Sequence, residues 1–127
     1  MGQYFKAVNL KKREYVCPWC LGGVAKLWEW SANPWGAIFP LLLRKSTEGG
    51  GGDYHGPTYE TDKTAIAGRW AGDPVVLVGD YDDSKLWDRL HRYRNISREV
   101  VEAWNAFIDI KEMNLTFHPD CSCNKHP

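Results

Sequence analysis

The four cysteines of this 127-residue chain stand in two pairs, one near each end of the sequence. Cys17 and Cys20 are separated by two residues, the spacing with which two thiolates bind one tetrahedral zinc ion. Cys121 and Cys123 form the second pair. A site shared by both pairs connects the C-terminal tail to the N-terminal region, so this feature constrains the fold more than any other.

Two histidines, His118 and His126, flank the second pair and leave more than one ligand set open. The sequence predicts a structural zinc (Zn²⁺) site made by the four cysteines, with either histidine as an alternate ligand. Disulfide bonds and free thiols are the other interpretations of the same residues. A structural zinc site fills all four coordination positions, so it implies no activated water.

The first pair also fits a redox site. Residues 17–20 read Cys-Pro-Trp-Cys and are expected to follow a strand and precede a helix, as in thioredoxin-like proteins. A helix N-terminus lowers the pKa of a thiol and makes it nucleophilic. However, Gly22 and Gly23 weaken the start of that helix, and two further cysteines favour metal binding over turnover. A thiol-disulfide oxidoreductase is therefore the alternative function.

Size and charge limit the possible partners. The chain is long enough for one domain (1–127) with a real core, and its 43% hydrophobic content argues against disorder. Its 16 basic and 16 acidic residues cancel, which indicates no nucleic-acid partner. The longest apolar run, 37–43, is too short to span a membrane, and no signal peptide is evident at the N-terminus. We therefore expect a cytoplasmic protein.

The residue patterns predict an α+β fold with an antiparallel sheet. Runs at 3–10 and 14–17 are typical of two strands joined by a turn. Runs at 64–70 and 75–78, separated by Ala-Gly-Asp-Pro, predict a central hairpin over about 64–80. Residues 115–117 are expected to add a short edge strand.

Three to four helices are expected to pack against this sheet, and the C-terminal tail is expected to lie against the N-terminal region. Apolar residues recur at helical spacing, and Ser97 is a suitable N-cap for the last helix. Two segments are expected to be irregular, a glycine-rich loop at 45–62 and a Cys/His-rich tail at 110–127. The predicted helices cover 21–30, 35–44, 84–93 and the segment after Ser97.

A second candidate site lies in the loops. Asp53 and His55 follow four consecutive glycines, and Asp73, Asp80 and Tyr81 lie at the turns around the predicted central hairpin. Because binding residues usually sit on loops held by a rigid scaffold, we expect these side chains to line one ligand pocket. Converging carboxylates also fit a cation-dependent enzyme on the Asp53/Asp80 face. Turn formation and helix capping are the simpler explanation of the same acidic residues.

Segments of the chain resemble a family of small proteins from prokaryotes and their phages that has no known activity. The resemblance rests on GQYFKAVN at 2–9, KLWE at 26–29, the glycine run ending in Asp53, and GRWAGDPVVLVGDY at 68–81. It covers roughly the first two-thirds of the chain and implies no reaction. Where the family pattern has Pro-His, this chain has Pro18-Trp19 between two cysteines, so the cysteines are an addition to the pattern and favour a stabilising role.

These observations predict a small, non-catalytic domain that binds a protein or small-molecule partner and is stabilised by zinc.

Overall fold

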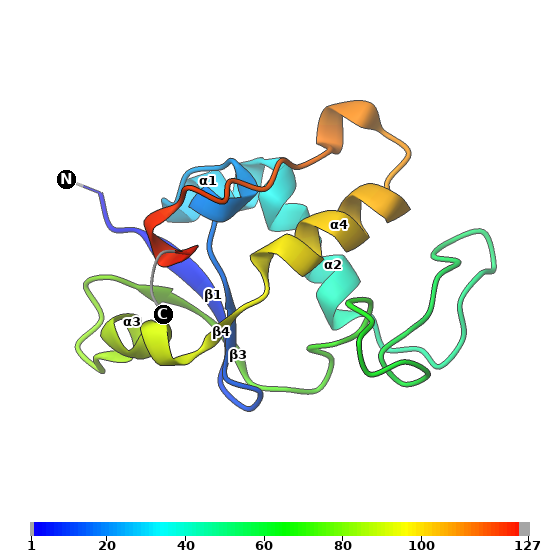
Figure 1. The fold of residues 1–127 in the computed structure, drawn as a ribbon, viewed down its shortest axis with the longest axis horizontal. Coiled ribbons are helices and arrows are strands. Elements are labelled where there is room, and N and C mark those ends of the chain that lie inside the picture. Colours follow the sequence, from blue (N-terminus) through cyan, green and yellow to red (C-terminus); the bar gives the residue numbers. More distant parts are fainter. Residues whose placement is uncertain (1, 125–127) are drawn as a thin grey trace.

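The computed structural model describes residues 2–124 and is built around a four-stranded sheet in the order β3-β1-β2-β4 (Figure 1). β1 pairs with β2 and with β3 in antiparallel fashion, whereas β4 pairs with β2 in parallel. The predicted α+β class is confirmed, but the sheet is mixed rather than purely antiparallel. The strands are β1 (Phe5–Asn9), β2 (Glu14–Val16), β3 (Val75–Gly79) and β4 (Arg94–Asn95).

In the described part of the chain, four α-helices surround the sheet and are extended by short 3₁₀ turns, which confirms the predicted three to four helices. The helix predicted at 21–30 is interrupted, because Gly22 adopts a left-handed conformation (φ 77°) that ends a 3₁₀ turn at Leu21. None of the helices within residues 2–124 has the length and apolarity needed to cross a membrane. The helices are α1 (Leu27–Ala32), α2 (Ile38–Leu43), α3 (Leu86–Arg89) and α4 (Ser97–Phe107).

The hairpin of this fold is β1–β2, as the runs at 3–10 and 14–17 predicted. Its turn is organised by Asn9, whose side-chain oxygen accepts hydrogen bonds from the backbone N–H groups of Lys11 and Lys12, at 2.9 and 2.8 Å. Asparagine favours turns because its side chain bonds to the backbone two residues later. Arg13 completes the reversal with a positive φ of 59°.

The predicted central hairpin at 64–80 is wrong in its first half. Only β3 is a strand, and it lies at the edge of the sheet rather than at its centre. Residues 64–74 instead form consecutive turns that are bound to the end of α2. The N–H groups of Gly68 and Trp70 donate to the carbonyls of Leu41 and Leu42, at 2.8 and 2.9 Å. Gly68 has a φ of 77°, which interrupts an extended chain.

Two apolar clusters cover the two faces of the sheet. Because consecutive strand residues point to opposite faces, Ala7 belongs to the cluster with α2 and α4, whereas Val8 belongs to the cluster with α3. Figure 1 shows α2 and α4 on one side of the strands and α3 on the other. The second cluster also contains Cys17 and Cys20, so the first cysteine pair is part of the hydrophobic core.

The C-terminal tail returns to the N-terminal region, as predicted. In Figure 1 its red segment lies beside the blue start of the chain, and the N–H of His118 donates to the carbonyl of Cys20 at 2.8 Å. The edge strand expected at 115–117 is not formed. Instead, the Asn105 side chain bonds to both backbone groups of Leu115, at 2.7 and 2.8 Å, and so replaces the strand partner.

Candidate metal centre

The first cysteine pair is held in a tight turn directly after β2. The N–H of Cys20 donates to the carbonyl of Cys17 at 3.1 Å, and that of Gly22 to the carbonyl of Trp19 at 3.2 Å. Gly22 must be glycine here, because it has a positive φ and a Cβ would lie 2.9 Å from the imidazole Nε2 of His118. The turn therefore points two thiols toward the returning tail.

The second pair lies in a short 3₁₀ turn at the end of the tail, Ser122–Asn124. It is preceded by a bend in which the N–H of Cys121 donates to the carbonyl of His118 at 3.3 Å. Cys17 and Cys20 are fully buried, whereas Cys121 and Cys123 are half-buried. The tail thus brings the second pair against the first pair.

All four Sγ atoms lie within 4.8 Å of one another. The separations are 2.9 Å for Cys20–Cys123, 3.4 Å for Cys121–Cys123 and 3.8 Å for Cys17–Cys121. Sulfurs at the corners of a tetrahedron around zinc are about 3.8 Å apart, because each Zn–S bond is about 2.3 Å long. The four-cysteine cluster therefore has the size and the donor set of a metal site such as a structural zinc site.

The alternatives of disulfide bonds and histidine ligands do not match this arrangement. All four cysteines are free thiols, and the 2.9 Å between the sulfurs of Cys20 and Cys123 exceeds the about 2.05 Å of a disulfide bond. Within residues 2–124 the metal-binding group consists of the four cysteines and does not include His118, whose ring lies against Gly22. His126 lies outside the described residues.

A polar side chain from β4 supports the sulfur atoms. The amide nitrogen of Asn95 donates to Sγ of Cys20 at 3.5 Å and to Sγ of Cys123 at 3.4 Å. The amide cannot be reversed without loss, because its oxygen accepts hydrogen bonds from the backbone N–H and the hydroxyl of Ser97. That hydroxyl in turn accepts a bond from the N–H of Cys17 at 3.0 Å. The Asn95 amide therefore donates to both sulfurs, and the sulfurs act as hydrogen-bond acceptors, as thiolates do.

The thiols perturb one another strongly. Hydrogen bonds from Cys123 and then from Cys17 lower the pKa of Cys20 to about 2, against the effect of burial. The pKa of Cys17 is raised, because its hydrogen bonds with Cys123 and Cys20 hold the proton and because it is buried. The thiols alone therefore stabilise one thiolate, at Cys20, while the pKa values of Cys17 and Cys123 are raised. A divalent metal ion removes this conflict, because all four sulfurs can then ionise.

A cation of the chain lies close to the cluster. The ammonium of Lys6 is 4.6 Å from the ring centre of Trp87, 5.6 Å from that of Tyr15 and 5.9 Å from that of Trp19. Lys6 and Cys123 line the same hollow of about 370 Å³.

The loop residues of the second candidate site are distributed over different surroundings. Asp53 and His55 line a hollow of about 690 Å³ with α4, and the Asp53 carboxylate lies 3.9 Å from the guanidinium of Arg44. Tyr81 lines a different hollow, beside β3. Asp80 accepts a hydrogen bond from the N–H of Tyr4 at 2.9 Å. The single shared pocket stays a prediction.

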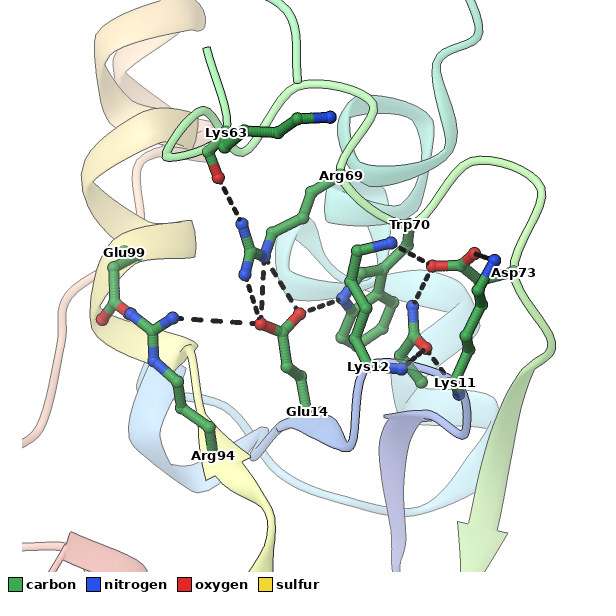
Figure 2. A network of polar contacts seen from close by, with 10 residues as sticks. Lys11, Lys12, Glu14, Lys63, Arg69, Trp70, Asp73, Arg94 and Glu99 are labelled. Carbon is green, nitrogen blue, oxygen red and sulfur yellow. Dashed lines mark hydrogen bonds and ion pairs between the residues drawn. The ribbon is translucent and has the colours of Figure 1, made fainter. Parts of the chain in front are cut away.

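Asp73 has partners of its own. Its carboxylate accepts hydrogen bonds from the side chains of Asn9 and Lys12, at 2.9 and 2.5 Å (Figure 2). These contacts fasten the turn before β3 to the β1–β2 turn. Asp73 therefore has a structural role of the kind that turn formation predicted.

Sequence reasoning missed the residues around the four-cysteine cluster. Asn95 and Lys6 are separated from the cysteines by many residues and belong to no recognisable motif. The only local signal was the Asn95-Ile96-Ser97 sequence, because Asn and Ser often bond to backbone groups before a helix. The approach of Asn95 to the sulfurs depends on strand pairing, which a single sequence does not reveal.

Comparison with known proteins does not assign the chain to a family. No protein-family model matches the chain, and no curated protein and no solved structure is significantly similar to it. The family resemblance of the sequence therefore stays a prediction.

Proposed function

We propose that this protein is a small, non-catalytic binding domain whose fold is completed by one structural zinc ion on Cys17, Cys20, Cys121 and Cys123. The observation that carries the proposal is the convergence of four sulfurs from both ends of the chain within 4.8 Å. Four thiolates fill a tetrahedral zinc, so no position is left for a water or a substrate. The ion would then act on stability rather than on chemistry.

The redox alternative has weaker support. A reactive thiol needs access to its substrate, yet Cys17 and Cys20 are both 0% exposed. The low pKa of Cys20 arises from the other thiols and not from a helix N-terminus, because α1 begins only at Leu27. A carboxylate-dependent enzyme has less support still, since Asp53 and Asp80 contact different partners.

Binding is the activity that the surface favours. Three large apolar residues around the start of α1 are exposed: Val24 by 44%, Leu27 by 52% and Trp28 by 64%. Neighbouring exposed apolar residues are typical of interaction sites. These residues follow the first cysteine pair closely, so a metal at that pair would fix the segment that presents them. A thiolate site also fits a reducing compartment such as the cytoplasm.

The test is the metal content of the purified full-length protein, measured by elemental analysis. We expect about one zinc per chain, and a Cys121→Ser variant should lose most of it. Ser122→Ala is the matched control, because it changes the same turn without removing a thiol. Fewer than about 0.2 zinc per chain in protein that stays folded in chelator would refute the metal site.

Thiol chemistry separates the alternatives. If the protein is a zinc-stabilised domain, its thiols should react slowly with a disulfide reagent until chelator is added, and it should not reduce insulin. Rapid reaction of one thiol in the untreated protein, together with insulin reduction, would favour the oxidoreductase. Sensitivity of the fold to reductant but not to chelator would favour disulfides.

A further inference from the structure

The outer edge of β3 is partly exposed at Val75 and Leu77, whereas its last residue, Gly79, is buried. β3 is the first strand in the order β3-β1-β2-β4, and among residues 2–124 it pairs with β1 alone. The bonds from Leu10 N–H to Pro74 C=O and from Asp80 N–H to Tyr4 C=O fix the register. In this register Val76 and Val78 direct their backbone groups to β1, so the alternate residues of β3 direct theirs outward.

These outward groups are unpaired. Within residues 2–124, the backbone N–H and C=O of Val75 and Leu77 have no hydrogen-bond partner on the outer side of the strand. Gly79, the third outward residue, has its carbonyl bonded to the N–H of Asp82 at 3.1 Å. The edge therefore offers a short template for an extended backbone.

The edge also lacks the features that usually protect such strands. Natural edges carry lysine, proline, a bulge or a covering segment, whereas β3 reads Val-Val-Leu-Val-Gly without a charge or a bulge. A hollow of about 590 Å³ lies beside β3 and is lined by residues from both faces of the sheet, such as Leu77 and Val76. Tyr81, which lines the same hollow, is 62% exposed.

We propose that β3 pairs with β3 of a second copy of this chain, in antiparallel fashion, to give a two-fold symmetric dimer with a continuous eight-stranded sheet. Leu77 then faces the second copy's Leu77, and Val76 faces the second copy's Val78. This register joins the outward N–H and C=O of Leu77 to those of the second copy's Leu77, because Leu77 lies at the middle of Val75–Gly79.

The side chains favour a second copy over an unrelated strand. In this register every residue of β3 meets an apolar residue or glycine, and no two charges of the same sign stand opposite each other. The flanking Asp80 lies opposite the second copy's Pro74, while Asp73 is already bound by Lys12. A two-fold interface requires this kind of self-complementarity.

The experiment measures the mass of the full-length protein by light scattering and analytical ultracentrifugation. We expect a mass of twice 14.5 kDa at about 100 μM, a concentration that populates a dimer whose Kd is in the micromolar range. Leu77→Pro removes an outward N–H without removing a bond to β1, and it should give monomers. Leu77→Ala is the matched control, because it shortens the side chain but keeps the N–H, and it should still dimerise.

Two further measurements keep the proposal testable if Leu77→Pro does not fold. Val76→Lys places a charge at a position that is 38% exposed in the monomer, and it should also give monomers that retain the native circular dichroism spectrum. Amide exchange of Val75 and Leu77 should slow with increasing concentration, whereas exchange of Val76 and Val78 should be slow throughout. A wild-type monomer at about 500 μM, or a dimer that survives both variants, would overturn the proposal.

Discussion

Two buried polar clusters lie at the two ends of strand β2, and they balance their charges differently. Glu14 begins the strand and is 3% exposed; the guanidinium of Arg69 donates to both of its oxygens, and the indole N–H of Trp70 adds a bond of 3.0 Å (Figure 2). Cys17 directly follows the strand, and its sulfur contacts other sulfurs. One end is neutralised by residues of the chain, whereas the other has a surplus of acidic groups.

The difference shows what each end needs in order to fold. The pair between Glu14 and Arg69 is complete as soon as the turns at 64–74 are formed, because both charges are encoded in the sequence. The thiols can ionise together only if a cation is supplied from outside. We infer that the stability of the first end depends on residues alone, whereas that of the second depends on metal supply.

The largest effect is expected at the cysteine end. Replacing Cys17 and Cys20 by serine should lower the free energy of unfolding by about 5 kcal/mol or more, because structural zinc contributes its binding energy to folding. Urea unfolding with and without chelator measures this. Chelator should destabilise the parent protein but have no further effect on the double variant, since both changes remove one interaction. Equal chelator effects on both proteins would contradict the comparison.

The next effect is expected at the opposite end of β2. Glu14→Gln should cost about 3–5 kcal/mol, because it leaves the guanidinium of Arg69, whose side chain is 12% exposed, without its counter-charge. Arg69→Met should cost a similar amount, and the double variant less than the sum of the two. The cycle is measured by urea unfolding. Zinc content should stay unchanged, and a loss of zinc in Glu14→Gln would show that the two ends are not independent.

The sequence predicted the cysteine end better than the charged end. The two-residue spacing of Cys17 and Cys20 is a local pattern with few chemical meanings, and the isolated second pair left few other partners. The network of Glu14 could not be predicted, because Arg69 follows it by 55 residues and lies in a segment with strand-like residues. Long-range pairing of charges leaves no periodic signal in a single sequence.

The fold was predicted where local rules dominate. The β1–β2 turn follows from Asn9. Helix α4 follows from the helical spacing of Val100, Val101 and Trp104. The strand expected at 64–70 failed because Gly68 and Trp70 bond to the end of α2, a tertiary contact that overrides β-propensity. Similarly, the edge strand expected at 115–117 failed because the Asn105 side chain bonds to the backbone of Leu115.

A smaller effect, and one that depends on pH, is expected at Asp73. Burial raises the pKa of this carboxyl, but hydrogen bonds from Lys12 and Asn9 outweigh it and lower the pKa below its ordinary value. The ionised carboxylate therefore stabilises the fold above pH of about 4, the pKa in the unfolded chain, and this contribution is lost as the pH falls through the lower folded-state pKa.

Asp73→Asn should therefore cost about 1–2 kcal/mol at pH 7, and the difference from the parent protein should shrink as the pH falls below about 4. Urea unfolding across this pH range measures both values. Ser122→Ala, which is far from this turn in the sequence, serves as the control for general acid effects. A difference that grows on acidification would mean that the pKa of Asp73 is raised, not lowered.

The smallest effect is expected for an exposed ion pair with the same geometry. Lys45 and Glu60 are 2.5 Å apart, as are Lys12 and Asp73, but their side chains are 74% and 41% exposed, against 20% and 6% for the buried pair. Lys45→Ala should change the free energy of unfolding by less than about 0.5 kcal/mol, because water screens the charges and two flexible side chains must be ordered. Lys12→Ala should cost clearly more and should show the pH dependence of Asp73. Parallel urea titrations of the two variants at low and high salt measure this, and only the small effect of Lys45→Ala should vanish at high salt. If both variants lost the same stability, burial would not be what separates the charged clusters of this protein from its surface.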